Sequence, residues 1–213
     1  LDLQIEWTWA VQTQISQLLA QFAESYGVRT ANRDLLDNIP YSVRDRCKVV
    51  ELCAPVEVKL EDDSDSGVEL IYRNYLTGSL HKKNAAGLDP YWLELDQGTP
   101  EWSDLRTDGI ACFTPTTKWV RDEPINSEHV RKQIPEIVEE LGRLFKEFTG
   151  YCLERGYVIV DTKFEVFRNS KWEWVLGDEI LTPESSRFIR VEDFEKVIYK
   201  SADKQLTRQL WID

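Results

Sequence analysis

Residues 157–167 read Tyr157-Val-Ile-Val-Asp161-Thr-Lys163-Phe-Glu165-Val-Phe167. This β-branched and aromatic composition predicts a strand, and the following Arg168-Asn-Ser-Lys171 predicts the turn of a hairpin whose second strand covers Trp172–Ile180 and ends before Pro183. Asp161, Lys163 and Glu165 stand at i, i+2 and i+4. Their side chains therefore leave the same face of the predicted sheet.

The returning segment, Leu176-Gly-Asp178-Glu179-Ile-Leu-Thr-Pro-Glu184-Ser-Ser-Arg187-Phe188, adds a second carboxylate to this face. In a hairpin Asp178 can lie close to Glu165. Two carboxylates beside Lys163 suit Mg²⁺ and the polyphosphate of a nucleotide, because magnesium prefers carboxylate, phosphate and water oxygens. The alternative is an exposed hairpin face whose charges are merely solvated, and spacing alone does not exclude it.

The segments before this hairpin mix helices and strands without strict βαβ alternation, which favours an α+β fold, a mixed antiparallel sheet with flanking helices. Helical spacing predicts a helix over Trp9–Tyr26, ended by Gly27. Strands are predicted over Val49–Leu60 and Val68–Leu76, joined by the exposed acidic tract 61–67.

The rest of the chain completes this α+β pattern. Asn84–Gly109 is loop-like, and it is either a lid or a long surface excursion. Ser127 opens a helix that continues to near Gly150 or Gly156, and short helices are predicted over Val191–Tyr199 and Ala202–Trp211. With no internal repeat in view, we interpret residues 1–213 as one domain.

Two further segments carry candidate binding residues. The strand over residues 68–76 delivers Arg73, and Thr77-Gly78-Ser79 predicts a turn whose N–H groups and Ser79 hydroxyl could bind a phosphate or carboxylate. Turns of this composition are common, so alone it is weak evidence for a ligand. Phe113–Lys118, followed by Arg121-Asp122-Glu123, reads on its own as a proline-containing loop beside a charged surface patch.

Composition narrows the class of partner. The net charge of −12 argues against nucleic acid, whose phosphate backbone demands a basic surface. No apolar run approaches the ~20 residues that span a bilayer, so we expect no membrane partner. The four cysteines are scattered without metal-site spacing, which predicts reduced thiols and a cytoplasmic location. A small phosphorylated substrate remains compatible with the local cations Arg73, Lys82, Lys83, Lys118, Lys163 and Arg187.

Taken together and in this order, these segments resemble the SAICAR synthetase family. The family pattern Val-Asp-Thr-Lys-Phe-Glu, followed by Asp-Glu-x-Leu-Thr-Pro-Asp-Ser-Ser-Arg-Phe, is matched at 160–165 and 178–188, with Glu184 in place of aspartate. Val-Glu-x-x-x-Arg-x-Tyr-x-x-Gly-Ser is matched at 68–79, and Phe-Thr-Pro-Ser-Thr-Lys at 113–118 with Thr116 for serine. A degenerate element stands at 121–126, and 203–208 resembles Asp-Lys-Gln-x-x-Arg.

The resemblance implies an ATP-dependent ligase of purine biosynthesis that joins L-aspartate to the carboxylate of the nucleotide CAIR. It implies Mg²⁺ held by Glu165 and Asp178, with Lys163 beside the ATP phosphates. Arg73, Ser79 and Arg187 would bind the CAIR phosphate, and Asp122 its aminoimidazole end. Asp161 and Lys118 would belong to the catalytic residues with Lys163, in roles that the resemblance does not separate. A homo-oligomer is compatible with the exposed tryptophans.

One family element has no counterpart before Trp9, namely a glycine- and lysine-rich loop that lies over the ATP phosphates. We expect this lobe to precede Leu1, because the ATP-side residues Lys163, Glu165 and Asp178 are present. Two alternatives stay open. One is a non-catalytic nucleotide-binding relative, and the other is a phosphotransferase that acts on another phosphorylated acceptor.

Overall fold

A computed structural model describes residues 19–30, 32–33, 49–50, 52–89, 91–118 and 122–197. Its main feature is an eight-stranded sheet with strand order β10-β8-β5-β4 along its central path. These strands are β10 (Ser186–Arg190), β8 (Tyr157–Arg168), β5 (Asp65–Arg73) and β4 (Glu57–Lys59). Four short strands join them: β3 (Ala54–Pro55), β6 (Cys112–Phe113), β7 (Thr116–Thr117) and β9 (Trp174–Gly177). Separately, β1 (Asn32–Arg33) pairs with β2 (Val49–Val50).

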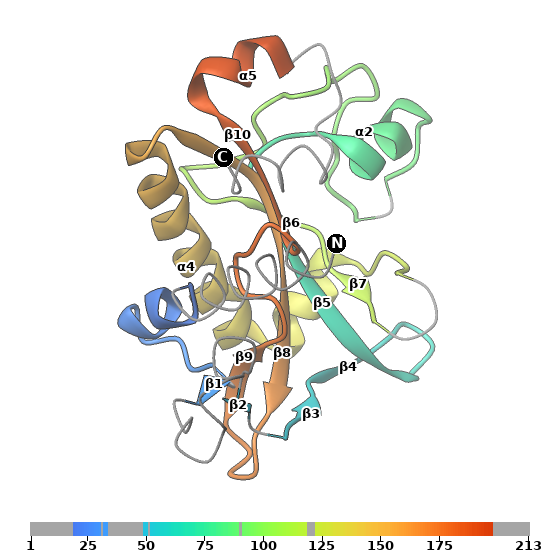
Figure 1. Cartoon of the computed structure of the whole chain (residues 1–213). Coiled ribbons are helices and arrows are strands. Elements are labelled where there is room, and N and C mark those ends of the chain that lie inside the picture. The colour runs from blue at the N-terminus through green and yellow to red at the C-terminus, as the bar shows by residue number, and fades with distance from the viewer. Residues whose placement is uncertain are drawn as a thin grey trace, which may run out of the picture.

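The strand β8 is the centre of the sheet, as Figure 1 shows. It pairs antiparallel with β5, β10, β9 and β3. Its predicted extent, Tyr157–Phe167, is confirmed to within one residue, and β9 confirms the returning strand of the hairpin in shorter form. The mixed antiparallel sheet with helices confirms the predicted α+β class.

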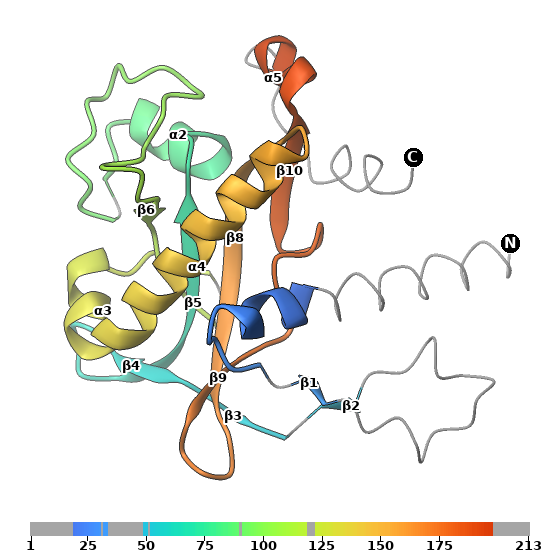
Figure 2. The same cartoon turned by 90° about the vertical axis from the view of Figure 1, so that its left-hand side faces the viewer.

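Helix α4 (Pro135–Glu154) covers one face of the sheet, running obliquely across β8 and β5 (Figure 2). The sequence predicted a single helix from Ser127, and this was wrong. A shorter helix, α3 (Ser127–Gln133), comes first, and Ile134 leaves the helical conformation immediately before Pro135. Proline disfavours helical geometry in the residue before it but fits the first turn of a new helix, so the chain breaks there.

The core lies between α4 and this face of the sheet. Tyr72, on β5, is its centre, with ring centroids 5.2 Å from Phe113, 6.1 Å from Phe145 and 5.8 Å from Phe164. Its hydroxyl donates a 2.7 Å hydrogen bond to the Val138 carbonyl of α4. Because side chains alternate along a strand, the neighbours of Tyr72 on β5, Ile71 and Arg73, face the opposite side of the sheet.

Several sequence predictions are corrected at their boundaries. The acidic tract is a turn at 61–64 only, because β5 already begins at Asp65. Thr77-Gly78-Ser79 starts a helix, α2 (Gly78–Ala85), instead of forming an isolated turn. The strand β10 was not predicted at all. Residues 86–89 and 91–109 contain no helix or strand, as expected for the loop.

The ends of the described region agree with the sequence in part. Residues 19–25 are helical, and Gly27 follows with φ +84°, as expected of a helix C-terminal glycine. Helix α5 (Val191–Val197) begins where it was predicted. The remainder of the first helix at 9–18, the predicted helix Ala202–Trp211 and the element at 203–208 lie outside the described residues.

Two properties bear on the environment of the protein. The described residues include no helix long and apolar enough to cross a membrane. Among the described residues, Cys112 and Cys152 are free thiols.

Candidate active site

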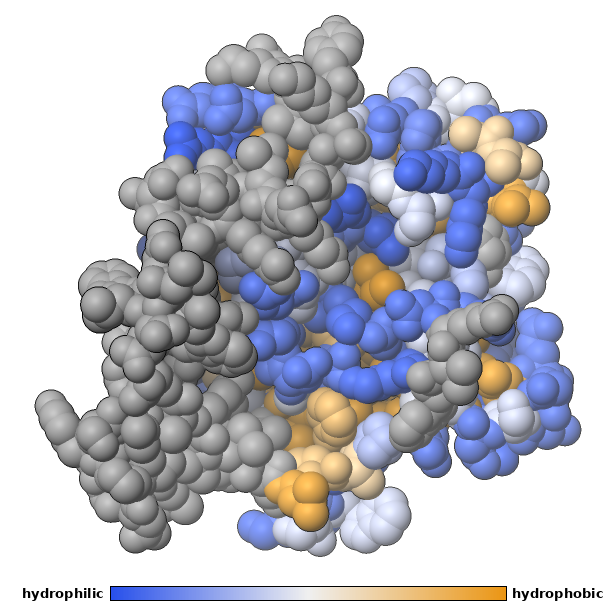
Figure 3. Space-filling view, turned by 45° about the vertical axis from the view of Figure 1, so that its right-hand side comes forward, coloured by the Kyte–Doolittle hydropathy of each residue, from blue (hydrophilic) through white to orange (hydrophobic). Residues whose placement is uncertain are grey.

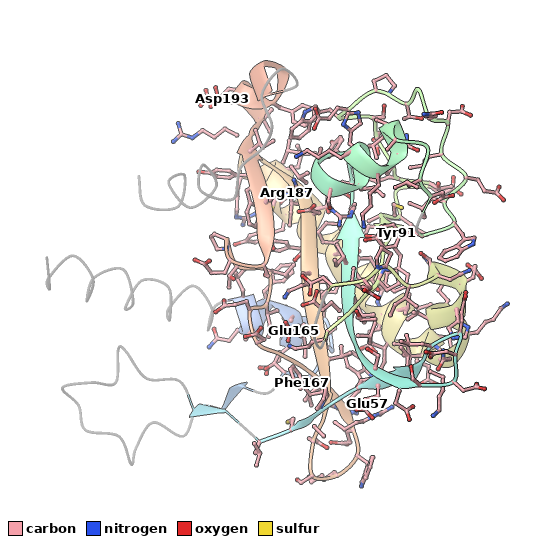
Figure 4. The ribbon with its side chains drawn as sticks, turned by 90° about the vertical axis from the view of Figure 1, so that its right-hand side faces the viewer. Glu57, Tyr91, Glu165, Phe167, Arg187 and Asp193 are labelled. Carbon is pink, nitrogen blue, oxygen red and sulfur yellow. The ribbon has the colours of Figure 1, made fainter. Side chains whose placement is uncertain are left out.

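The sheet face opposite α4 collects charged side chains from three adjacent strands. In the pairing of β5 with β8, Glu69 lies opposite Glu165 and Arg73 lies opposite Asp161. In the pairing of β10 with β8, Arg187 also lies opposite Asp161. The register shifts by one residue between Arg187 and Phe188, next to this pair, and such a bulge reorients side chains locally. Glu165 and Arg187 mark the two ends of this charged row in Figure 4.

A cleft of about 630 Å³ lies over this face. Helix α2 and the loop that follows it form its other wall, so Tyr91 lies across from Arg187 in Figure 4. Hydrophilic residues dominate the middle of the oblique space-filling view (Figure 3). The lining residues are Glu69, Ile71, Arg73, Ser79, Lys83, Tyr91, Thr116, Asp122, Asp161, Thr162, Lys163, Glu184, Ser185 and Arg187.

At one end of the cleft, two arginines share one carboxylate. Arg73 Nη1 donates to Asp161 Oδ2 at 2.9 Å, and Arg187 Nε donates to Asp161 Oδ1 at 2.8 Å, with a second contact from Arg187 Nη2 to Oδ2. Their relative exposures are only 7%, 8% and 7% for Arg73, Arg187 and Asp161. Burial opposes the charge of Arg187, but the Asp161 carboxylate outweighs it and raises the pKa of the guanidinium. The cluster keeps one net positive charge.

At the other end, lysines separate carboxylates. Lys163 Nζ donates to Glu69 Oε1 at 2.7 Å and to Glu165 Oε1 at 3.0 Å, which offsets the repulsion of two acids placed directly across paired strands. Lys118 forms an ion pair with Glu165 Oε2. Burial lowers the pKa of the Lys118 ammonium, although the charge of nearby Asp178 opposes this. This end therefore holds both signs of charge close together.

The donor set at this second end fits a divalent cation. Glu165 Oε2 is buried and accepts no hydrogen bond of normal geometry, although the Lys118 ammonium contacts it. Asp178 supplies a second hard oxygen donor close to Lys118. No group of three metal-ligating side chains is found in the described part of the chain. Two carboxylates nevertheless suffice for Mg²⁺ where phosphate oxygens and water complete the shell.

The sequence segments that form this cleft match those of one protein family. The profile of the SAICAR synthetase family matches residues 3–213. The chain belongs to this family. Its Val-Asp-Thr-Lys-Phe-Glu motif builds the centre of the cleft from β8, and its Gly-Ser motif starts α2.

Individual relatives agree with the family assignment. A phosphoribosylaminoimidazole-succinocarboxamide synthase of Corynebacterium ammoniagenes is 34% identical over 153 residues, covering 68% of this chain and 50% of that protein. One from Pichia angusta is 28% identical over 215 residues, covering 95% and 69%. Several matches, including that of Histophilus somni at 58%, span little more than half of the relative.

Solved structures support the fold. The SAICAR synthase of Saccharomyces cerevisiae in complex with SAICAR superposes with a TM-score of 0.71 at 23% identity, covering 96% of this chain and 79% of that one. A SAICAR synthetase in complex with ADP gives a TM-score of 0.66 at 19% identity, covering 95% and 78%. At these identities the likeness shows a shared architecture alone.

The structure brings together most of the residues singled out from the sequence. Six of them line the cleft: Arg73, Ser79, Asp122, Asp161, Lys163 and Arg187. Glu165 and Lys118 do not line it but are ion-paired beside Lys163. Asp178 is exposed, adopts a left-handed backbone conformation with φ +57°, and does not line the cleft, although its charge acts on Lys118.

Several lining residues could not be given a role from the sequence. Glu69 stands four residues before Arg73 on the same strand, so alternation alone could have placed it on the charged face. Thr116 Oγ1 donates to Glu69 Oε2 at 3.0 Å, a contact that depends on the pairing of β7 with β5. Tyr91 comes from the loop, where no periodicity exists to reveal its position.

Gly78 is required where α2 approaches Arg187. Its φ is +59°, and a Cβ there would lie 3.1 Å from Arg187 Nη1. We therefore expect Gly78→Ala to lower the free energy of unfolding by about 1–2 kcal/mol from backbone strain, and to displace the Arg187 guanidinium. Chemical denaturation measures the first effect, and weaker binding of phosphorylated ligands the second. Wild-type values for both in Gly78→Ala would contradict this close approach.

Cys112 lies beside Arg73 but is not equipped as a nucleophile. Burial raises the pKa of its thiol to about 11, although the charges of Arg73 and Arg131 oppose the shift. At pH 8 the thiolate fraction is then only about 0.001. We expect Cys112 to resist iodoacetamide in the folded protein and to react after denaturation, as measured by mass spectrometry. Rapid alkylation of Cys112 under native conditions would refute this environment.

Proposed function

We propose that this chain forms the active-site cleft of an ATP-dependent carbon–nitrogen ligase. In this reaction, L-aspartate is joined to the carboxylate of CAIR, giving SAICAR, ADP and phosphate. The observation that carries the proposal is the row of paired charges across β5, β8 and β10, with a buried arginine cluster at one end and a lysine–carboxylate cluster at the other. One end suits a phosphomonoester, and the other a nucleotide polyphosphate with its metal ion.

The arginine end anchors the phosphate of CAIR in this account. Arg73 and Arg187 present planar guanidinium groups, which can each donate two hydrogen bonds to phosphate oxygens. Asp161 holds both guanidiniums by direct hydrogen bonds, so they are positioned before the substrate arrives. The Ser79 hydroxyl and the exposed Asp122 carboxylate also line this cleft, and a carboxylate suits the exocyclic amine of CAIR.

The lysine end binds the ATP phosphates. Glu165 and Asp178 would hold Mg²⁺, which when bound offsets charge on the phosphate oxygens. Lys163 and Lys118 would remain near the transferred phosphoryl group, because their partner Glu165 fixes them at the same end of the cleft. Fixed cations of this kind stabilise the charge that develops during phosphoryl transfer.

The chemistry then proceeds in two displacements. A carboxylate oxygen of CAIR bonds to the γ-phosphorus of ATP while the bond to ADP breaks, giving an acyl phosphate. The neutral amine of L-aspartate attacks the acyl carbon, phosphate leaves, and the nitrogen loses a proton. The cleft contributes mainly by holding CAIR and ATP at fixed positions along one sheet face, which removes much of the entropic cost of their encounter.

Substrate-dependent ADP release tests this function. The intact protein, with ATP, Mg²⁺ and L-aspartate, is assayed with and without CAIR, and SAICAR is quantified in parallel. We expect ADP and SAICAR to form in equal amounts and only with CAIR. ADP release that ignores CAIR but requires another phosphorylated acceptor would indicate a phosphotransferase. CAIR binding without any ADP release would indicate a non-catalytic relative.

The proposal includes a cytoplasmic location, since free thiols such as Cys112 and Cys152 are typical of reducing compartments. Its partners are the small molecules CAIR, L-aspartate and ATP, and neither nucleic acid nor membrane is needed. The homo-oligomer with which the sequence is compatible stays a prediction.

A further inference from the structure

Lys83 is a lining cation to which the family resemblance gives no role. It lies on α2, one helical turn after Ser79, so both side chains occupy the same side of the helix and both line the cleft. Its neighbour Lys82 is exposed and does not line the cleft. The helix therefore presents one of two adjacent lysines to the site.

Lys83 forms no ion pair with an acid in the described part of the chain. The other lining cations each have a carboxylate partner: Arg73 and Arg187 bind Asp161, and Lys163 binds Glu69. For Lys83, neither an ion pair nor a hydrogen bond to a carboxylate is found among the described residues. Its contact is with an aromatic ring, because Nζ lies 5.9 Å from the ring centroid of Tyr91.

Tyr91 links Lys83 to the arginine end of the cleft. Burial raises the pKa of the Tyr91 hydroxyl; the nearby charge of Arg73 opposes this shift and that of Asp122 adds to it, so the ring lies close to Arg73 and Asp122 as well as to Lys83. Two cations thus converge on one buried aromatic side chain, close to which the Asp122 carboxylate also lies. Placing like charges together is unfavourable unless an anion joins them.

We propose that Lys83, held over the Tyr91 ring, is a further ligand of the substrate's phosphomonoester and completes the charge of its site. The identification of this ligand as CAIR rests on the proposed function. Arg73, Arg187 and Asp161 together carry one positive charge, and Lys83 brings the total to two. A phosphomonoester carries close to two negative charges at neutral pH, which matches the charge of these four side chains, although the carboxylates of Asp122 and Glu184 also line the cleft.

The test is a set of matched variants in the intact protein. Lys83→Met removes the charge but keeps the length of the side chain, Lys83→Arg keeps the charge, and Lys82→Met is the control on the same helix. Calorimetry measures the dissociation constants of CAIR, of its dephosphorylated nucleoside and of ribose 5-phosphate. Steady-state assays give KM for CAIR and for L-aspartate.

We expect Lys83→Met to weaken the binding of CAIR and of ribose 5-phosphate at least about tenfold, as for the loss of a charge-assisted hydrogen bond. The nucleoside should bind Lys83→Met and wild type equally, and Lys83→Arg and Lys82→Met should stay close to wild type with CAIR. Thermal unfolding confirms that Lys83→Met is folded.

Three outcomes would overturn the assignment. The first is an unchanged affinity of Lys83→Met for CAIR. The second is a loss of affinity for the nucleoside as large as the loss for CAIR. The third is a rise in KM for L-aspartate alone, which would place Lys83 at the amino acid. Failure of the proposed function would give a different result from failure of the Lys83 assignment. In that case wild type would not turn over CAIR, while ribose 5-phosphate would still bind and would still depend on Lys83.

Discussion

Asp161→Asn is expected to cost about 3–5 kcal/mol of unfolding free energy, because it leaves two buried guanidiniums without a counter-charge. Arg73 and Arg187 are 7% and 8% exposed, so water cannot replace the lost carboxylate. The asparagine amide would also direct a donor toward guanidinium donors. Chemical denaturation of Asp161→Asn beside wild type measures the effect.

The matched control is Asp108→Asn, the same chemical change at an exposed loop position. Asp108 has φ +54°, and asparagine tolerates this left-handed conformation well, so we expect its stability to stay within about 0.5 kcal/mol of wild type. A loss below about 1 kcal/mol in Asp161→Asn would mean that the carboxylate does not hold the arginine cluster together.

Asp178→Asn is expected to lower turnover by at least about a hundredfold while leaving stability unchanged. Asp178 is exposed, and its φ of +57° again suits asparagine, so the substitution should change the charge and little else. The loss follows from removing one of the two carboxylates assigned to Mg²⁺. The measurements are kcat, the Mg²⁺ concentration for half-maximal rate, and the unfolding free energy.

The metal assignment predicts a specific pattern across these measurements. In Asp178→Asn the required Mg²⁺ concentration should rise, and Asp108→Asn should match wild type in all three. Near-normal turnover in Asp178→Asn at limiting Mg²⁺ would refute the role of Asp178. A large loss of stability would instead mean that Asp178 is structural.

Strand alternation explains which parts of the site could be predicted. Asp161, Lys163 and Glu165 were placed on one face from their spacing, and the pairing of β8 with β5 then adds Arg73 and Glu69 to that face. The same pairing could not be derived from either strand alone, because register depends on tertiary contacts. Lys118 reaches Glu165 only because β7 pairs with β5, and no local pattern predicts this.

The fold was predictable where a long segment keeps one pattern of apolar residues, and less so where the segment is short. Eleven of the twelve residues of β8 were recognised, whereas the five residues of β10 were missed, since Pro183 was taken to end the hairpin. Pro135 divided a helix whose apolar spacing continues across the break. Tyr91 enters the cleft from an irregular loop, where packing of Leu76 and Leu80 against the loop decides its position.

Isotope transfer tests the central claim, that the cleft activates the carboxylate of CAIR with the γ-phosphate of ATP. The intact protein is given CAIR labelled with ¹⁸O in its carboxylate, together with ATP, Mg²⁺ and L-aspartate, and the released phosphate is analysed by mass spectrometry. We expect one carboxylate oxygen to appear in the phosphate of each turnover. Phosphate without label, formed in step with ADP, would contradict this account of the site.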